Sequence, residues 1–383
     1  MQKNAALLGA VAIVAGTIFG AGAFGLPYAL AQSGPAVGLF WFAVIGGAVL
    51  CLHLMYGSLQ SDGNVRGRLI SLVSGYFGTR FRFIPMVSTI VGAGGALLAY
   101  IIVGGYFLDI LFDGLGGLDT RGWSLIFGGI FFCLIFVGLR SAARLETIGT
   151  LVLFFGVWAL AAFLFHGGSV FALPQGSLVG AFVPYGIILF SLYGANAIPE
   201  AIEYLEGDKK KLVPAVVIGT LVPLVTYIAF AFSVLMVVGS HIQTEAISSL
   251  IPFVPREIVM AGAFIGFLAI ATSFVVVGAY LADTLHYDMR INARVARICA
   301  GGIPIILFMS GIRDFALVTG TIGSILGGID GILISLMFMR QRRLTGRHQL
   351  IAFPALIPAL VVAIFSVGIV GEIVMLIAQH IWE

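Results

Sequence analysis

The first hydrophobic segment of the chain is interrupted by Gly16-Thr17-Ile18-Phe19-Gly20-Ala21-Gly22-Ala23-Phe24-Gly25-Leu26-Pro27. This stretch is too rich in glycine to remain helical by intrinsic propensity. A second interruption runs from Pro184-Tyr185-Gly186 through Phe190-Ser191-Leu192-Tyr193-Gly194-Ala195-Asn196 to Pro199. Lipid cannot satisfy the N–H and C=O groups of a broken helix, so such breaks persist only where protein, water or a ligand replaces the lost hydrogen bonds. Paired breaks therefore indicate the central binding site of a secondary transporter.

The composition supports a membrane protein. Of the 383 residues, 60% are hydrophobic and only 10% are charged, which a soluble core does not explain. The net charge of +3 does not indicate a nucleic-acid partner, because the basic residues lie in short loops between apolar segments. The first apolar segment is too long for a signal peptide and lacks a small-residue cleavage site, so we expect it to be retained.

Eleven apolar runs of about 20 residues, enough to cross a bilayer as helices, can be marked along the chain. They cover about 5–31, 36–59, 83–112, 122–140, 146–166, 178–199, 212–239, 257–285, 291–312, 315–339 and 351–380. The sequence therefore predicts one all-α transmembrane domain over residues 1–383, with eleven transmembrane helices.

The basic residues are distributed unevenly around these spans. With the N-terminus in the cytoplasm, 17 of the 20 Lys and Arg residues fall inside, and only Arg121, Arg256 and Arg313 fall outside. This asymmetry follows the positive-inside rule and would be lost if one span were added or removed. We therefore expect a multi-pass protein of a prokaryotic inner membrane, with its C-terminus outside.

The two breaks also define a repeat. Five spans over about 5–166 and five over about 178–339 have opposite orientations, and each set opens with a broken helix. This arrangement is typical of a 5+5 inverted repeat. The last span, about 351–380, is left as a peripheral helix. No repeat is visible by direct sequence identity.

Several motifs resemble a known group of transporters. Ala15-Gly16-Thr17-Ile18-Phe19-Gly20-Ala21-Gly22 followed by Leu26-Pro27 is similar to the first helix of the amino acid/auxin and aromatic amino acid permeases. Later stretches resemble the bacterial tryptophan/tyrosine permeases, namely Ile198-Pro199-Glu200, Tyr204, Asp208-Lys209-Lys210-Lys211-Leu212, Ile218-Gly219-Thr220-Leu221-Val222-Pro223-Leu224, Ala271-Thr272-Ser273-Phe274 and Asp283. The resemblance covers about residues 5–290. It implies a LeuT-like fold within the amino acid/polyamine/organocation superfamily, with spans one, two, six and seven rocking against the rest.

The first break has the properties of an amino-acid site. Gly20, Ala21 and Gly22 let a ligand approach the backbone, and N–H groups at the start of the following half-helix favour a carboxylate. Carbonyls freed near Phe190, Ser191 and Tyr193 are acceptors for an ammonium group. By resemblance, Tyr100 and Phe190 face the substrate side chain. The predicted substrate-binding residues are Thr17, Ile18, Gly20, Ala21, Gly22, Tyr100, Phe190, Ser191, Tyr193 and Gly194.

Other interpretations of the breaks remain open. Gly16 and Gly20 form a small-xxx-small pair that also suits close helix packing, and Pro184 and Gly194 also occur in kinked helices. The run from Ser191 to Asn196 departs from the Ser-Phe-Gly-Phe-like run of the related permeases. This departure leaves the side-chain specificity open.

The coupling ion has two candidates. Thr272 and Ser273 offer neighbouring hydroxyls for sodium, and by resemblance the other ligands are the carbonyls of Ala15, Ile18 and Ala269. Such hydroxyls also often bond back to a carbonyl one turn earlier. Related aromatic permeases are generally regarded as proton-coupled although they carry a similar Thr-Ser-Phe run, so the hydroxyl pair leaves the ion open.

A proton route would need a titratable group within the membrane. Asp330 in the tenth span is the candidate for a relay, with a structural hydrogen bond as the alternative. The fifth span carries no lysine that could replace sodium. Glu372 lies on the leftover helix, where we favour a structural or oligomeric role.

The remaining polar residues suggest no catalytic chemistry. The six histidines are scattered, mostly at span ends, and are interpreted as interfacial. The three cysteines suit neither a disulfide framework nor a metal site, and we expect no cofactor and no transition metal. The segment 241–255 is long enough to form an external lid, although an ordinary loop is equally allowed.

The sequence therefore predicts a transporter and not an enzyme. We expect a cation-coupled importer of neutral L-amino acids, aromatic or large aliphatic, in which sodium or a proton is the coupling ion and a monomer suffices. The expected partners are the substrate and the lipid bilayer. A membrane-embedded enzyme would require clustered reactive groups in facing spans, and a channel would require a continuous polar lining. Neither pattern is evident in the chain.

Overall fold

The computed structural model describes residues 2–62, 67–112, 117–137, 142–167, 173–345, 350–351 and 353–382. Within these ranges the chain is helical and contains no β-strand. The elements in chain order are α1 (Gln2–Ile18), η1 (Ala21–Gly25), α2 (Leu26–Ser33), α3 (Pro35–Asp62), α4 (Leu69–Phe77), η2 (Thr79–Arg82), α5 (Phe83–Leu111), α6 (Thr120–Val137), α7 (Ala142–Gly167), η3 (Gly180–Phe182), α8 (Val183–Leu192), α9 (Ala197–Tyr204), α10 (Lys209–Val238), η4 (Gly239–His241), α11 (Ala246–Ser249), α12 (Arg256–Asp283), η5 (Thr284–Asp288), α13 (Ala293–Met309), α14 (Phe315–Thr321), η6 (Ile322–Gly327), α15 (Gly328–Thr345) and α16 (Leu356–Trp382).

By length and composition, eight helical stretches among the described residues can cross a membrane: Pro35–Ser61, Thr79–Leu111, Gly149–His166, Gly180–Tyr204, Lys209–His241, Arg256–Asp288, Phe315–Arg343 and Leu356–Ala378. One more span, Ala6–Ile18 with Ala21–Ser33, is bent by 48° at its break. The predicted spans 122–140 and 291–312 correspond to the shorter helices α6 and α13. The described residues therefore contain eight to nine candidate spans, and the predicted number of eleven spans is not confirmed.

The short length of α13 has local causes. It begins after Asn292, whose side-chain oxygen accepts the N–H of Arg294. It ends at Met309, and the nearby Gly311 has a φ of +109°, a conformation that favours glycine. The helix therefore has 17 residues, fewer than the about 20 that a bilayer usually requires.

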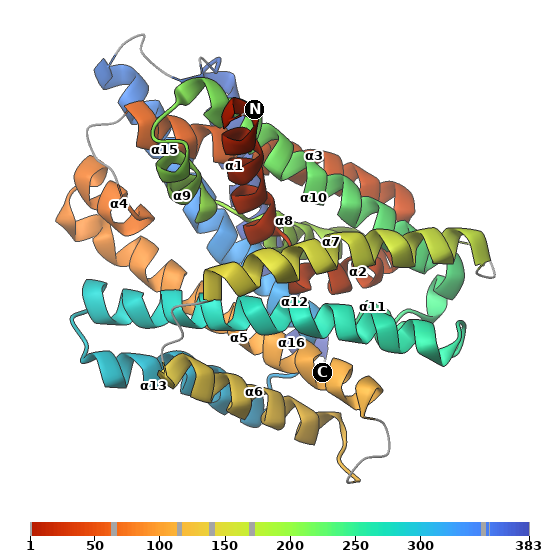
Figure 1. The fold of residues 1–383 in the computed structure, drawn as a ribbon. Coiled ribbons are helices and arrows are strands. Elements are labelled where there is room, and N and C mark those ends of the chain that lie inside the picture. Colours follow the sequence, from red (N-terminus) through yellow and green to blue (C-terminus); the bar gives the residue numbers. More distant parts are fainter. Residues whose placement is uncertain are drawn as a thin grey trace.

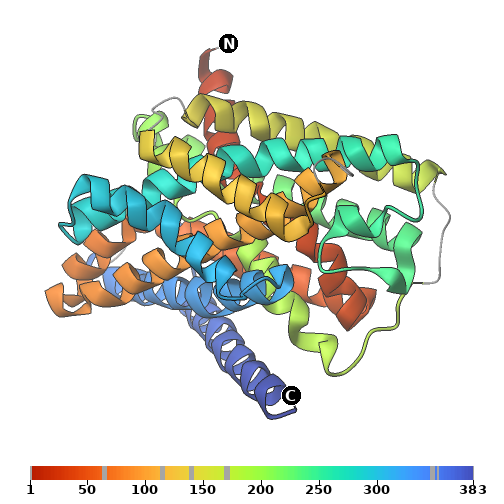
Figure 2. The same ribbon diagram turned by 90° about the horizontal axis from the view of Figure 1, so that it is seen from below.

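Long helices pack across one another in the bundle (Figure 1). α12 lies along α5 and α7, and α13 joins α5, α6 and α12. α1 packs against α9 and α10, which places the first break beside the seventh predicted span. Figure 2 shows α16 leaving the bundle, with the C-terminus at its free end. This agrees with the predicted peripheral helix.

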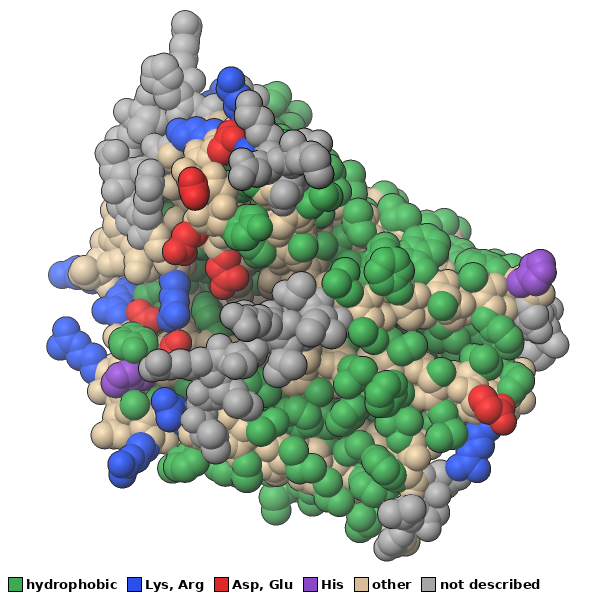
Figure 3. Space-filling view, viewed as in Figure 1, with side chains coloured by type: hydrophobic (Ala, Val, Ile, Leu, Met, Phe, Trp, Pro, Cys, Tyr) green, Lys and Arg blue, Asp and Glu red, His purple; other side chains and the backbone are tan. Residues whose placement is uncertain are grey.

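The surface is that of a protein solvated by lipid. Figure 3 shows a broad hydrophobic surface over α6, α7 and α12, and charged side chains gathered at the edge where α12 ends and α13 begins. Large side chains are exposed on these helices, for example Ile130 at 54%, Phe155 at 66% and Phe264 at 52%. Soluble monomers rarely expose apolar patches of this extent, so this face is suited to the bilayer.

Candidate functional site

The first break lies between α1 and η1. α1 ends at Ile18, and Gly20 is extended, with φ and ψ both −163°. All residues of η1 are buried. A Cβ atom on Gly22 would lie 2.7 Å from Cα of Ser191, so only glycine allows the two segments to approach this closely.

The second break lies between α8 and α9. α8 ends at Leu192, Tyr193 is extended (φ −69°, ψ 112°), and α9 begins at Ala197. A Cβ atom on Gly194 would lie 2.5 Å from Cγ1 of Ile18. The two breaks therefore pack directly against each other, through Gly22 with Ser191 and through Ile18 with Gly194.

Tyr227 of α10 satisfies the backbone of the first break. The N–H of Gly20 donates to the Tyr227 hydroxyl at 3.1 Å, and that hydroxyl donates to the carbonyl of Ile18 at 2.8 Å. The ring is fully buried and meets Phe19 edge-on, with 5.7 Å between the ring centroids. One phenol thus serves as acceptor and donor for both sides of the break. Sequence reasoning missed this residue, which carries no local signal.

His53 of α3 satisfies the backbone of the second break. The N–H of Gly194 donates to Nε2 at 3.2 Å, and Nδ1 lies 3.0 Å from the hydroxyl of Thr220 on α10. Since Nε2 accepts, we assign the proton of the neutral ring to Nδ1, which donates to Thr220. The prediction that the histidines are interfacial is wrong for His53. Its side chain is fully buried, because it lies within α3 and reaches inward to the break.

The predicted substrate residues divide into two groups. Tyr100 on α5 is buried, and its hydroxyl lies 3.7 Å from the position that a Cβ atom on Gly20 would take. Phe190 is half-buried, while Ser191 is buried and donates to the carbonyl of Ile187 at 2.6 Å. The side chain of Thr17 is exposed and donates to its own helix, so the structure does not bring it together with the others.

The predicted sodium ligands already have hydrogen bonds. The Thr272 hydroxyl donates to the carbonyl of Ala269 at 3.0 Å, which is the back-bonding alternative considered above. The carbonyl of Ala15 accepts the N–H of Phe19 at 2.8 Å, and that of Ile18 accepts Tyr227. Ser273 is buried on α12. Since a carbonyl oxygen has a second lone pair, these bonds do not prevent coordination, and the sodium site stays a prediction.

α7 lies beside both parts of this predicted site. A Cβ atom on Gly16 would lie 3.4 Å from the hydroxyl oxygen of Thr150, and one on Gly149 would lie 2.8 Å from that of Thr272. Thr150 and Gly149 are neighbours on α7. Its contacts with Gly16 and Thr272 therefore connect the α1 and α12 sides of the predicted sodium site.

Asp330 contacts the second break directly. The hydroxyl of Tyr193 donates to Oδ2 of Asp330 at 2.9 Å, and the carboxylate is buried. The other oxygen, Oδ1, is buried and has no hydrogen-bond partner among the described residues. The structure thus brings together the predicted relay residue and a predicted substrate residue.

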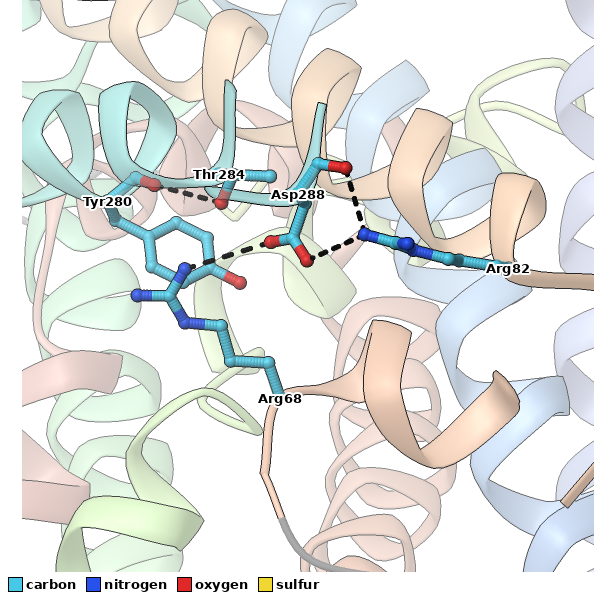
Figure 4. Close-up of polar contacts among 5 residues, drawn as sticks. All are labelled: Arg68, Arg82, Tyr280, Thr284 and Asp288. Carbon is cyan, nitrogen blue, oxygen red and sulfur yellow. Dashed lines mark hydrogen bonds and ion pairs between the residues drawn. The ribbon is translucent and has the colours of Figure 1, made fainter. Parts of the chain in front are cut away.

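A cluster of charged residues joins the start of α4 and the end of η2 to η5 (Figure 4). Asp288 is 3.9 Å from Arg68 and 3.3 Å from Arg82 in its two ion pairs. The guanidinium of Arg68 also lies over the ring of Tyr280, 5.2 Å from its centroid. Sequence reasoning missed these pairs, which join the start of α4 and α5 to the end of η5.

The segment between α10 and α12 contacts the first break through α11, and its role as a lid stays a prediction. α11 packs against η1, α2, α5 and α12. Glu245 caps the first turn of α11, because the two oxygens of the Glu245 side chain accept the N–H groups of Ile247 at 2.6 Å and Ser248 at 2.8 Å. Burial raises the pKa of Glu245 to about 7.

Known relatives were found by sequence. The chain is 28% identical over 240 residues to the tyrosine-specific transport system 1 of Haemophilus influenzae, covering 59% of this chain and 56% of that relative. It is 26% identical over 255 residues to the tryptophan-specific transport protein of Pseudomonas aeruginosa, covering 61% and 58%. The chain spans just over half the length of the curated relatives it matches.

A solved structure shares the fold. The crystal structure of MhsT in complex with L-phenylalanine matches with a TM-score of 0.64 at 13% sequence identity, covering 97% of this chain and 98% of that one. This match confirms the expected LeuT-like fold. The model of the tryptophan/tyrosine permease family matches residues 3–309. The chain therefore belongs to the tryptophan/tyrosine permease family, a family of membrane transporters and not of enzymes.

Proposed function

We propose that this chain imports aromatic L-amino acids by cation-coupled alternating access. The observation that carries the proposal is the direct packing of the two broken helices, through Gly22 with Ser191 and Ile18 with Gly194. Breaks of this kind near the membrane midplane are the usual substrate sites of secondary transporters. The named relatives transport tyrosine or tryptophan, which supports an aromatic substrate.

In this proposal the substrate is held mainly by backbone. Its carboxylate meets N–H groups from Gly20 to Gly22, and its ammonium group meets carbonyls near Ser191 and Tyr193. The side chain extends toward Tyr100 and Phe190. Because Gly22 is in contact with Ser191, the two segments must separate to admit a ligand. Tyr227 then exchanges its bonds at Gly20 and Ile18 for contacts of the substrate or ion.

We also propose the finer architecture. α6 and α13 would be the fourth and ninth spans, completing eleven, with repeats over about 5–166 and 178–339 and a peripheral helix over about 351–380. The N-terminus would be cytoplasmic and the C-terminus outside. The gathering of charged side chains at one edge of the bundle supports this orientation (Figure 3).

Coupling requires one of two ions. Sodium would bind the carbonyls of Ala15, Ile18 and Ala269 together with the hydroxyls of Thr272 and Ser273. A proton would instead be carried by Asp330, and the bond from Tyr193 together with the unpaired Oδ1 favours this candidate. Either cation contributes about 2.3 kcal/mol per 100 mV of membrane potential to the accumulation of a zwitterion.

Uptake into proteoliposomes tests the proposal. Labelled L-tyrosine, L-tryptophan and L-leucine are offered under a sodium gradient, a proton gradient or neither. Accumulation driven by protons and lost in Asp330→Asn, but kept in Thr272→Ala/Ser273→Ala, would support the proton candidate. The opposite pattern would support sodium. Absence of uptake under both gradients would contradict the transport function itself.

A further inference from the structure

The peripheral helix α16 carries a buried carboxylate that faces the bundle. Only 8% of Glu372 is exposed. Its Oε1 accepts the hydroxyl of Thr321 at 3.0 Å, and its Oε2 accepts the hydroxyl of Ser324 at 3.0 Å. Both carboxylate oxygens therefore have a hydroxyl partner on the neighbouring helix. Glu372 thus binds the tenth predicted span instead of pointing toward lipid, as an oligomer contact would.

Among the described elements that pack against α16, α3, α8 and η6 contain no Lys or Arg. α16 packs against α3, α8, η6 and α15, and α8 and η6 contain no charged residue. α15 carries Asp330 near its start and its first arginine only at Arg340. In α3, both ring nitrogens of His53 are engaged by Gly194 and Thr220. A buried ionised carboxylate is costly unless a counter-charge accompanies it.

The backbone next to Glu372 departs from the regular α-helix. Ile322–Gly327 forms a π-helix, η6, and Thr321 and Ser324 lie at its first turn. Short π-helical turns inside α-helices are frequent at functional sites. Four side-chain oxygens therefore converge between α16 and η6.

This donor set selects the class of ligand. Carboxylate and hydroxyl oxygens are hard ligands that suit hard cations. A divalent ion would leave an excess positive charge in the membrane, whereas a monovalent ion balances Glu372. Transition metals prefer nitrogen and sulfur, and the described residues contain no cluster of three His, Cys, Asp or Glu side chains.

We propose that Glu372, Thr321 and Ser324 bind one monovalent alkali cation between α16 and η6. The site is separate from Thr272 and Ser273 and does not depend on which ion drives transport. η6 packs tightly on α8, since a Cβ atom on Gly323 would lie 2.7 Å from the backbone nitrogen of Phe190. A cation that joins η6 to α16 would therefore restrict the movement of α8, the half-helix that precedes the second break.

Binding of radioactive sodium to the purified full-length protein in nanodiscs tests this site without requiring transport. We expect a saturable sodium component that lithium or potassium, but not choline, displaces. Glu372→Gln should weaken it at least tenfold, which corresponds to about 1.4 kcal/mol. Thr321→Val/Ser324→Ala, which keeps the carboxylate, should also weaken it. Ser335→Ala on α15, which removes a buried hydroxyl that donates to the carbonyl of Gly331, is the matched control and should retain the component.

Four outcomes would overturn the proposal. Wild-type protein with no saturable sodium binding would rule out the cation, as would equal binding in Glu372→Gln and wild type. A signal lost only in Thr272→Ala/Ser273→Ala would assign it to the other candidate site. If Glu372→Gln does not fold, Thr321→Val/Ser324→Ala decides. Sodium binding in that variant equal to wild type would contradict the site.

Discussion

The two broken helices satisfy the free backbone N–H and C=O groups at their breaks in different ways. At the first break, the hydroxyl of Tyr227 bonds both Gly20 and Ile18, so a single side chain of α10 serves both sides of the break. At the second break, Nε2 of His53 accepts a hydrogen bond from the N–H of Gly194, and Nδ1 bonds the hydroxyl of Thr220. The second break is thereby tied to α3 and α10 at once.

This difference indicates how each break can respond to a ligand. Tyr227 can exchange its two bonds for a carboxylate or a cation without breaking another contact between helices. His53 cannot leave Gly194 without also disturbing Thr220. Since Thr220 and Tyr227 are seven residues apart, they lie on the same face of α10. A movement of α10 would therefore disturb hydrogen bonds at both breaks.

The largest effect is expected where the breaks touch. Gly22→Ala would place a methyl group against the backbone of Ser191, which cannot move aside as a side-chain tip can. Overpacking costs typically about 1–3 kcal/mol, and a backbone contact belongs at the upper end of that range. We expect uptake to fall to background and the melting temperature in detergent to drop.

The matched control for this change is Gly94→Ala on α5. A Cβ atom there has no neighbour within 4 Å, so uptake and melting temperature should stay near the wild-type values. If Gly22→Ala were as active as Gly94→Ala, the close packing of the two breaks would be refuted.

The two breaks should differ in their response to pH, because α11, which follows Glu245, packs on η1 of the first break. Burial raises the pKa of Glu245 from 4.5 to about 7, so the folded protein holds this proton more tightly than the unfolded chain. The resulting stabilisation is complete below about pH 4.5 and is lost as the pH rises through about 7, a change of about 3 kcal/mol.

Thermal unfolding between pH 5 and 8 checks this expectation. The melting temperature of wild type relative to Glu245→Gln should fall as the pH rises. A difference between the two proteins that is constant over this range would show that Glu245 does not titrate there.

The second break can be weakened through its anchor. His53→Phe keeps a ring of similar size but leaves the N–H of Gly194 without an acceptor, at a cost of about 1–3 kcal/mol. Thr220→Val removes only the hydrogen bond between His53 and Thr220, so it should lower the stability less than His53→Phe. The order is read from melting temperatures in detergent, and a larger loss in Thr220→Val would contradict the role given to His53.

The smallest loss is expected at the first break. Tyr227→Phe removes one hydroxyl and keeps the ring beside Phe19, which should cost about 1–2 kcal/mol. A bound amino acid or cation can then satisfy Gly20 and Ile18, so saturating L-tyrosine should raise the melting temperature more in Tyr227→Phe than in wild type. His53→Phe should show no such extra gain. Equal gains in the two variants would remove the proposed difference between the breaks.

The sequence predicts where the helices break but not what holds the breaks. Glycine and proline are local signals, and α1 and α8 end at Ile18 and Leu192, within the predicted stretches. The bond from Gly20 to Tyr227 spans 207 positions and that from Gly194 to His53 spans 141. Nothing in the local pattern identifies partners that only the packed bundle brings together.

The ion candidates show the same limit. Asp330 is recognisable as a rare charge in an apolar span, but its contact with Tyr193 depends on how α15 meets the second break. Thr272 is recognisable as a hydroxyl donor, yet its back-bond to Ala269 is equally consistent with the sequence. Hydropathy likewise marks α13 as a span without revealing that the helix begins only after Asn292.

Chemical labelling at the contact between the breaks tests the central claim most directly. Ser191→Cys is made in a chain whose Cys51, Cys133 and Cys299 are replaced by serine, and its reaction with a maleimide is timed with and without L-tyrosine or L-tryptophan. If the breaks hold the substrate, an aromatic L-amino acid slows the labelling of Ser191→Cys but not that of Gly94→Cys. Equal rates with and without the amino acid at Ser191→Cys would contradict a substrate site between the two breaks.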